Sequence, residues 1–386
     1  MITNNISQFN YCFGCGVCSA VCPAKIITIE LNEDGFWAPR IADKLKCTNC
    51  GLCLKVCGFA QKQSAPKPEN ISSFAAFSKS NATRLSCTSG GVAFELGKWG
   101  LSHNYKIIGC VYNFEKQIAE HVLINTEEEL EKTKGSKYIQ SNFSNVLLQI
   151  KKEDRYLCFG SPCQIDSLRR FFKLKRMEEQ CIFIDFFCHG VPSYLAWQKY
   201  IQYQQKVNKL DSLKKVEFRN KSLGWHAYTI LLSDGKKDFL GSTASGDYYY
   251  QLFLGDLCLN KPCYFDCRYK QFSSYADIRV GDLWGKKYKN DQVGISGVLV
   301  YSERGKNILD NLQSSCEIIR ESLETITEGQ MKLCPRIPSD YKNISKILRE
   351  EKFEKIISFL QRKKIMMLPL RITKKLLRII NTVLGK

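Results

Sequence analysis

Beyond about residue 72, short apolar runs alternate along the chain with segments of helical character. The runs Lys106–Tyr112, Arg155–Phe159 and Cys181–Phe187 predict strands. A Gly-Ser-Pro turn follows the second run, and the segment Cys163–Phe172 after it predicts a helix. This strand–helix–strand order is typical of a parallel pair of strands in an α/β layer.

The pattern differs on either side of this pair. Thr126–Lys134 predicts a capped acidic helix, and shorter strands from about Val216 predict an α+β region. The polar stretch Gln61–Asn70 predicts a linker. No G-x-G-x-x-G follows a strand and no Walker A loop is present, so a Rossmann or P-loop site is not expected. The predicted divisions are 1–62 for an N-terminal module, 63–71 for the linker, 72–150 and 151–340 for the two parts of a large domain, and 341–386 for a helical basic amphipathic tail.

The end of the tail has a segregated apolar face. At about 100° per residue, the apolar residues after Pro369 fall on one side of a helix and the basic residues on the other. Eight positive charges and no acids lie between Arg362 and Lys386. This pattern predicts peripheral attachment of residues 362–386 to an anionic membrane surface; the alternative is packing on the protein's own body or on a partner.

Charge and composition narrow the class of protein. The formal net charge is +19, but much of it belongs to the tail, and the mildly basic main body argues against nucleic-acid binding. There is no run of eighteen apolar residues and no pattern typical of a secretion signal. Nineteen cysteines without such a signal predict a cytoplasmic protein that uses cysteine for metal and not for disulfides.

The N-terminal module carries two copies of one cysteine pattern. The copies read Cys12-x2-Cys15-x2-Cys18-x3-Cys22-Pro23 and Cys47-x2-Cys50-x2-Cys53-x3-Cys57-Gly58. In two-cluster ferredoxins the fourth cysteine of each run ligates the other cluster. We therefore predict one 4Fe–4S cluster and then a second, with ligands Cys12, Cys15, Cys18 and Cys57 for the first and Cys47, Cys50, Cys53 and Cys22 for the second. Two zinc sites or a disulfide set are the alternatives, but they do not usually place three cysteines within seven residues.

Cysteines also follow the two predicted parallel strands. Cys163 lies after Gly160-Ser161-Pro162 and Cys188 begins Cys188-His189-Gly190, so both should lie at the carboxyl edge of the sheet. Ser161 suits an N-cap and Pro162 the first helical position, which places Cys163 in a first turn where the helix dipole favours a thiolate. With Cys263 and Cys267 these residues would make a third four-thiolate site. The alternative is that they are ordinary buried cysteines.

Several motifs after the module resemble those of the family of coenzyme F420 hydrogenase/dehydrogenase beta subunits. They span roughly residues 72–340 and comprise Ser89-Gly90-Gly91, Gly135-Ser136-Lys137-Tyr138-Ile139-Gln140-Ser141, Gly160-Ser161-Pro162-Cys163-Gln164, Cys188-His189-Gly190-Val191-Pro192-Ser193 and Gly281-Asp282-Leu283-Trp284-Gly285. The resemblance implies an iron–sulfur domain that binds FAD, and it supports the prediction of a third 4Fe–4S cluster. Forms with a fused ferredoxin module resemble those found among surface-polysaccharide biosynthesis proteins.

The chain departs from the family pattern at the third site. The family usually has C-x2-C where this chain has Cys263-x3-Cys267, and Cys258 is nearby, so the choice of ligands stays open. The remaining cysteines match no ligand position and are interpreted as structural: Cys87, Cys110, Cys158, Cys181, Cys316 and Cys334.

The expected fold class is α+β multidomain, with a bacterial-type dicluster ferredoxin fold followed by an α/β flavin-binding iron–sulfur domain. Backbone amides and one cation in the glycine-rich segments suit a pyrophosphate. The predicted cofactor-binding residues are Ser89, Gly90, Gly91, Gly135, Ser136, Lys137, Gly160, Ser161, Gln164 and Gly190; plain turns are the alternative. His189 is a candidate proton donor or an outer partner of a cysteine ligand, and Asp282 is a turn, capping or site residue.

Together these features predict an oxidoreductase that passes electrons between ferredoxin-type clusters and FAD, and to or from a hydride-accepting substrate. The alternative is a non-enzymatic subunit that feeds a partner oxidoreductase, for example in surface-polysaccharide biosynthesis. Either function needs a redox donor or partner oxidoreductase and no nucleic acid. The predicted location is the cytoplasm, with the tail at the inner face of the cytoplasmic membrane.

Overall fold

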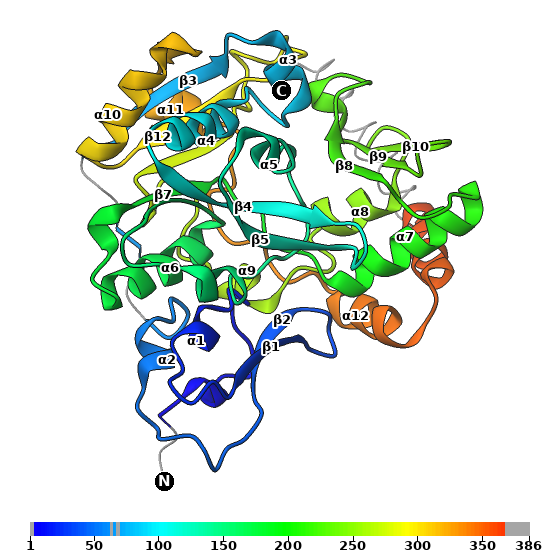
Figure 1. The fold of residues 1–386 in the computed structure, drawn as a ribbon. Helices are drawn as coiled ribbons and strands as arrows, with labels where there is room; N and C mark the ends of the chain where they lie inside the picture. Colours follow the sequence, from blue (N-terminus) through cyan, green and yellow to red (C-terminus); the bar gives the residue numbers. More distant parts are fainter. Residues whose placement is uncertain (1–3, 62–64, 67–69, 367–386) are drawn as a thin grey trace, which may run out of the picture.

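The computed structural model describes residues 4–61, 65–66 and 70–366. Figure 1 shows a small N-terminal module, in blue, below a larger body built around a central sheet, with a second sheet to one side. The module lies against the body near helices α6 (Pro162–Leu174) and α9 (Lys261–Phe265).

The module repeats one turn-and-helix unit in each cysteine run. Its elements are η1 (Ile6–Gln8), α1 (Val17–Ala20), β1 (Ile27–Leu31), β2 (Trp37–Ile41) and α2 (Leu52–Lys55). Strands β1 and β2 pair antiparallel, with Ile27 opposite Ile41. Each helix begins after a glycine in the left-handed region, Gly16 (φ 79°) and Gly51 (φ 73°), where other residues would be strained. These glycines allow a tight backbone turn in each run, so that three of its cysteines line one cavity.

The body is organised by one eight-stranded sheet of order β13-β3-β12-β11-β7-β6-β4-β5. Its strands are β3 (Ser72–Ser78), β4 (Tyr105–Asn113), β5 (Ile118–Ile124), β6 (Arg155–Phe159), β7 (Cys181–Phe186), β11 (Ile278–Asp282), β12 (Ser296–Val300) and β13 (Cys316–Arg320). The parallel neighbours are β4 with β6, β6 with β7, and β7 with β11. The predicted parallel pair, β6 and β7, is confirmed, and both parts of the large domain contribute strands to the same sheet.

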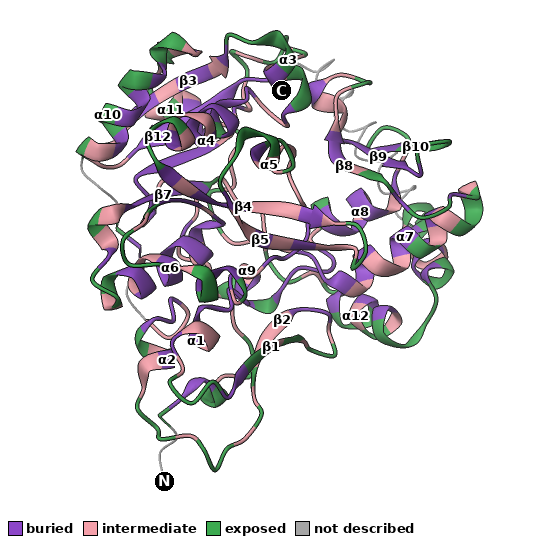
Figure 2. Ribbon diagram, viewed as in Figure 1, coloured by how far each residue is buried: buried purple, intermediate pink, exposed green. Residues whose placement is uncertain are grey.

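Helices and 3-10 turns cover the sheet and fill the connections. They are α3 (Asn81–Ser86), α4 (Val92–Ser102), α5 (Glu127–Glu131), η2 (Val146–Gln149), α6 (Pro162–Leu174), η3 (Glu178–Gln180), α7 (Tyr194–Asn208), η4 (Trp225–Ala227), α8 (Tyr248–Leu254), α9 (Lys261–Phe265), α10 (Glu303–Asn311), η5 (Leu312–Ser314), α11 (Leu323–Thr327) and α12 (Tyr341–Glu350). The strands between these layers are largely buried (Figure 2). The predicted acidic helix is shorter than expected: its N-cap is Thr126, as predicted, but it ends at Glu131.

A second, antiparallel sheet has the order β10-β9-β8. Its strands are β8 (Lys215–Asn220), β9 (Thr229–Ser233) and β10 (Asp238–Ser242). Aromatic side chains from β8, α7 and α8 pack behind it in the same apolar cluster, among them Phe218, Trp197 and Tyr249. The α+β prediction from about residue 216 is therefore correct for this sheet, but β11, β12 and β13 of the same region join the main sheet.

The first part of the predicted tail is helical and packs into this core. Helix α12 and the helix over 353–366 bury Ile344, Leu348, Ile356 and Leu360 among the aromatic residues of the second sheet. Residues 367–386, which carry the predicted amphipathic face, lie outside the described residues. None of the helices in the described part of the chain has the length and hydropathy required to cross a bilayer.

Candidate functional site

Four cysteines of the module surround one cavity at the end nearest the body. Cys12, Cys15, Cys18 and Cys57 line this cavity, which we call the first cavity, together with Ser167 from α6. Burial raises the pKa of the Cys12 and Cys57 thiols to about 12, and the neighbouring cysteines add to this rise. A metal cluster that stabilises thiolates is the chemistry that suits four sulfurs held so close together.

The other four cysteines surround a second cavity at the far end of the module. This second cavity is lined by Cys22, Cys47, Cys50 and Cys53, and the Asn5 amide donates to Cys47 Sγ at 3.3 Å. The structure thus brings together the two sets of four that the crosswise scheme predicts. Among the described residues, no group of three or more cysteine, histidine or acidic side chains has an arrangement that could hold a single metal ion. Both donor sets fit a four-thiolate cluster, but their role as ligands stays a prediction.

The two cavities differ in their exposure to solvent. Cys15, Cys18 and Cys57 of the first cavity are buried, whereas Cys50 of the second is exposed. Around the first cavity the module is tied to the body by hydrogen bonds: Phe143 N donates to Cys15 O at 2.8 Å, and Gly58 N donates to Ser167 Oγ at 3.0 Å. The first cavity therefore lies between the second cavity and the body.

A third group of cysteines forms within the body. The Cys163 thiol interacts electrostatically with Cys188, Cys267 and Cys263, so the four residues predicted from the sequence do come together. Cys163 follows β6 and Cys188 follows β7, at the shared carboxyl edge of these parallel strands. Burial raises the pKa of the Cys163 thiol well above its ordinary value, so the expected thiolate preference from the helix dipole is outweighed by desolvation. A bound cluster would be needed to hold the Cys163 sulfur as a thiolate.

The structure separates the two neighbouring cysteines that bear on this group. The sulfur of Cys258 is hydrogen-bonded to the backbone of Ser193, and the cysteines of the third group are not among its interactions. Cys334 lies against Cys267: its thiol is within hydrogen-bonding distance of Cys267 O, at 3.2 Å, and of the Cys267 sulfur, and the contact with the sulfur lowers the pKa of the Cys267 thiol. No motif in the sequence indicates this contact, because Cys334 is 67 positions away from Cys267.

Positive charge lies beside the third group. Lys270 Nζ donates to Cys188 O at 3.0 Å and to His189 O at 2.8 Å, and none of the described carboxylates is within ion-pair distance of it. Arg279 is also near Cys188, but it forms a buried ion pair with Asp185 at 2.6 Å. An uncompensated cation suits a cluster whose four thiolates give it a net negative charge.

Helix α6 connects the first cavity with the third group. Cys163 lies in its first turn, and Asp166 and Ser167 follow at the three- and four-residue spacing that places side chains on one face. Ser167 is hydrogen-bonded to the Cys15 sulfur, and Tyr269 donates to Asp166 at 2.7 Å.

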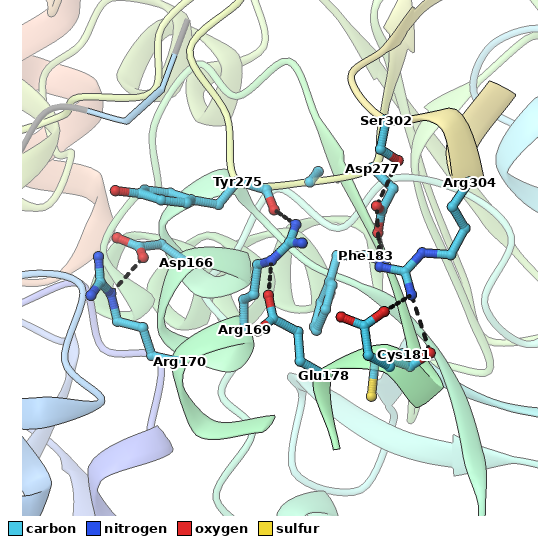
Figure 3. A network of polar contacts seen from close by, with 12 residues as sticks. Asp166, Arg169, Arg170, Glu178, Cys181, Phe183, Tyr275, Asp277, Ser302 and Arg304 are labelled. Carbon is cyan, nitrogen blue, oxygen red and sulfur yellow. Dashed lines mark hydrogen bonds and ion pairs between the residues drawn. The ribbon is translucent and has the colours of Figure 1, made fainter. Parts of the chain in front are cut away.

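Arginines stabilise α6 and tie it to its neighbours. Figure 3 shows Arg170 paired with Asp166 within the helix, and Arg169 bridging Glu178 and the Tyr275 carbonyl outside it. The contacts of Arg169, at 2.7 and 2.8 Å, fix the helix that carries Cys163 to the segments beside it.

The predicted flavin residues lie in two places. In the first, which we call the paired loops, Ser89-Gly90-Gly91 precedes α4 and Gly135-Ser136-Lys137 follows α5, and Ser136 N donates to Thr88 Oγ1 at 2.7 Å. A Cβ at Gly90 would lie 2.5 Å from Ala76 O, so this glycine permits close packing on β3. A Cβ at Gly135 would have no neighbour within 4 Å, so this loop is open.

Two lysines stand at the paired loops without acidic partners. Lys137 Nζ donates to Thr133 O at 2.7 Å, and Lys221 Nζ donates to Ser89 O at 2.9 Å. Burial lowers the pKa of both ammonium groups to about 8. Within the described part of the chain neither forms an ion pair with a carboxylate. Two such cations beside the start of a helix fit an anionic group such as a phosphate. Lys221 was not predicted from the sequence, because it lies more than 80 residues from Lys137 in a region with no recognised motif.

The second place is the edge beside the third group. There Ser161 caps α6, and Gln164 Oε1 accepts from Ser161 N at 2.9 Å while Gln164 Nε2 donates to Ser141 O at 2.8 Å. Gly160 N donates to Ile184 O at 3.2 Å, and a Cβ at Gly190 would lie 2.8 Å from Leu259. The polar groups of Ser161 and Gln164 are thus used within the protein, and they position Cys163.

His189 and Asp282 both have charged partners. His189 Nε2 lies 2.8 Å from Asp256 Oδ1, and its ring packs edge-on against Phe253. Asp282 ends β11 and pairs with the buried Arg219 at 2.8 Å, so its role is that of an ion-pair partner rather than a turn or cap. Arg219 also donates to Tyr138 OH at 3.1 Å.

Comparison with known proteins agrees with this architecture. Residues 11–60 match the 4Fe-4S dicluster domain, and this match together with the relatives described below indicates an iron–sulfur electron-transfer protein of the oxidoreductase type. Residues 153–325 match the model that describes the C terminus of the beta subunit of coenzyme F420 hydrogenase/dehydrogenase. The resemblance inferred from the sequence is confirmed: residues 153–325 are similar to the C terminus of coenzyme F420 hydrogenase/dehydrogenase beta subunits, and they are preceded by an N-terminal dicluster domain.

Individual relatives come from redox complexes. The F component of the F(420)H(2) dehydrogenase of Methanosarcina mazei is 26% identical over 333 residues, covering 82% of this chain and 86% of the relative. The B component of the Na(+)-translocating ferredoxin:NAD(+) oxidoreductase complex of Acetobacterium woodii is 40% identical over 78 residues, 20% of this chain and 22% of that one. A chain in the solved structure of the xenon-derivatised F420-reducing NiFe hydrogenase complex from Methanosarcina barkeri aligns with a TM-score of 0.46 and 16% identity over 79% of this chain and 94% of that chain.

Proposed function

We propose that this chain is an iron–sulfur flavoprotein oxidoreductase that passes electrons between three 4Fe–4S clusters and FAD, and to or from a hydride-accepting substrate. The observation that carries the proposal is the position of α6. Its first turn holds Cys163 of the third group, and its next turn places Ser167 on the wall of the first cavity. Three groups of four cysteines thus follow one another from the exposed end of the module to the carboxyl edge of the sheet.

The proposed ligands are those of the crosswise scheme and the third group. The first cavity would hold a cluster on Cys12, Cys15, Cys18 and Cys57, and the second cavity would hold one on Cys22, Cys47, Cys50 and Cys53. The third would be held by Cys163, Cys188, Cys263 and Cys267. Cys334 would donate a hydrogen bond to the Cys267 sulfur, and Lys270 would offset the negative charge.

The paired loops would hold the phosphates of FAD. Lys137 and Lys221 supply cations, while the amides at the start of α4 supply donors. When bound, FAD supplies the conversion between one-electron and two-electron chemistry. His189, whose Nε2 lies 2.8 Å from Asp256 Oδ1, is the candidate proton donor on the edge beside the third group.

A second candidate function is an electron-transfer subunit that feeds a partner oxidoreductase. It is favoured by the relatives, whose names describe components of complexes. A role in surface-polysaccharide biosynthesis belongs to the same candidate. Turnover by the isolated chain, mixed anaerobically with reduced ferredoxin and candidate acceptors, distinguishes the two: catalysis without co-purified partners supports the enzyme.

The flavin provides the direct test. Protein purified without oxygen should release FAD on acid treatment, measured by fluorescence of the supernatant. Protein that contains iron and shows cluster absorption but releases no flavin would overturn the flavoprotein proposal and leave the electron-transfer subunit.

Replacing Lys137 with glutamine should weaken FAD binding about tenfold or more, because a charge-assisted hydrogen bond to a phosphate is lost. Lys132→Gln is the matched control, since Lys132 is exposed on the same segment. The affinity of the unmodified protein should be greatest below about pH 8 and fall above it, because the lysines with lowered pKa lose their protons there. Equal FAD dissociation constants for the two variants, measured by fluorescence titration, would remove the paired loops as the phosphate site.

We also propose that residues 362–386 bind peripherally to anionic membranes at the inner face of the cytoplasmic membrane. Among the described residues, Lys363 already pairs with Asp340, so the later cations of this segment must supply most of the attraction. The full chain should float with anionic liposomes and not with neutral ones, and high salt should release it. A chain ending at Gln361 should stay in the soluble fraction; if it floats equally well, the segment is not the anchor.

A further inference from the structure

The rim of the second cavity is exposed to solvent. The loop 43–50 runs along this rim and lies at the exposed lower end of the module (Figure 2). Leu45 is 98% exposed, and the lysines on either side of it, Lys44 and Lys46, are exposed as well. Cys50, at the end of the loop, is the exposed cysteine of the cavity.

The charge of this rim is mainly positive. Lys25 is exposed between Ala24 and Ile26, both of which line the second cavity. The acid of the loop is Asp43, which lies 3.5 Å from Lys46 in a solvent-exposed pair that contributes little. The rim therefore presents three lysines against one acid around an apolar side chain that projects into solvent. We call Lys25, Lys44, Leu45 and Lys46 the basic rim.

We propose that the basic rim is the docking site of a soluble acidic one-electron carrier protein, such as an acidic ferredoxin. This inference rests on the proposed function, because it requires a cluster in the second cavity. The positive rim would attract the acidic carrier and speed its encounter, while Leu45 would make the short-range apolar contact. In the step itself, the reduced carrier loses one electron and the oxidised cluster of the second cavity gains it, with no bond or proton exchanged.

The rest of the module explains why this end would receive the carrier. The first cavity faces the body, where Ser167 lines it and Asn260 Nδ2 donates to Cys12 O at 2.9 Å. A protein carrier has no access to that cavity from the side covered by the body. The second cavity lies at the end of the module away from these contacts, and its Cys50 is exposed, so an external protein can approach it.

The test is the rate of reduction by an acidic 2Fe–2S ferredoxin, measured by anaerobic stopped-flow at several ionic strengths. Lys44→Glu/Lys46→Glu should slow reduction at low salt about tenfold or more and flatten the salt dependence, because electrostatic steering is reversed. Lys236→Glu/Lys237→Glu is the matched control: it makes the same change in net charge in the turn between β9 and β10, away from the module. Lys44→Gln/Lys46→Gln should have an intermediate effect, and Leu45→Gln should slow reduction with the salt dependence retained.

Reduction by dithionite separates docking from the clusters themselves. All variants should contain the same iron and be reduced by dithionite at the same rate. If the clusters are present and the ferredoxin rate is the same in the Lys44→Glu/Lys46→Glu and Lys236→Glu/Lys237→Glu variants, the docking site is wrong and the proposed function stands. If the unmodified protein lacks the two module clusters, the proposed function itself fails. If anionic liposomes bind the Lys44→Glu/Lys46→Glu variant less than the unmodified protein while the ferredoxin rate is unchanged, the rim is a lipid surface and the carrier proposal is overturned.

Discussion

Replacing both Cys57 and Cys12 with alanine should remove no more iron than replacing Cys57 alone. Both residues line the first cavity, so either change should abolish the same cluster and about four iron atoms per chain. Cys57→Ala/Cys47→Ala, by contrast, should remove about eight, because Cys47 lines the second cavity. Iron quantitation on anaerobically purified protein provides the measurement, since non-additive losses identify residues that act as one unit.

Two further comparisons of iron content test the crosswise scheme. Cys316→Ala, a buried cysteine on β13 far from both cavities in the sequence, should retain all of the iron. Cys22→Ala/Cys47→Ala should behave like Cys22→Ala alone. If Cys57→Ala/Cys47→Ala retained more iron than Cys57→Ala/Cys12→Ala, each run would hold its own cluster and the crosswise scheme would be wrong.

The second large effect is expected from Cys188→Ala, which should lower the iron content from about twelve to about eight atoms per chain. The remaining eight belong to the module, whose cavities do not use this residue. Cys258→Ala should leave the iron content unchanged, because the Cys258 sulfur is hydrogen-bonded to the Ser193 backbone and does not interact with the third group. The two variants differ by about four iron atoms although both remove one cysteine.

Cys334 refines this prediction. If Cys334 only donates a hydrogen bond to the Cys267 sulfur, Cys334→Ala should keep the third cluster and lower its reduction potential, because a bond to a ligand sulfur is lost. Redox titration followed by electron paramagnetic resonance measures both effects. Loss of about four iron atoms in Cys334→Ala with full iron in Cys267→Ala would show that the two residues have exchanged roles. A content of about eight iron atoms in the unmodified protein would rule out the third cluster.

Local features of the chain could be predicted from the sequence. The cysteine spacing within each run depends on one tight turn and a glycine, Gly16 or Gly51, so the composition of each cavity could be predicted, including the exchange of the fourth cysteine. The order of β6, α6 and β7 and the cap at Ser161 were likewise set by neighbouring residues. These are short-range constraints, which a sequence carries directly.

Long-range contacts were decided by the tertiary structure. Cys334 reaches Cys267, and Lys221 reaches Ser89, through folding of segments that share no motif or regular spacing. The sequence pattern predicts a single amphipathic tail, yet apolar residues up to 360 pack behind the second sheet, because an apolar face is buried by whichever surface is nearest in the fold. Gln164 is a predicted cofactor-binding residue, but the structure uses its amide to cap α6 and to hold Ser141.

The sequence by itself determined that this chain gathers cysteines for iron–sulfur chemistry and places two of them at the ends of parallel strands. Only the tertiary structure decided the order of the three groups, because that order depends on the contact of the module with α6 through Gly58 and Ser167, residues 109 positions apart. It also decided that the second cavity faces solvent and the first faces the body. Spacing along a chain sets which side chains can share a turn, whereas burial and access to solvent depend on what the rest of the fold places around them.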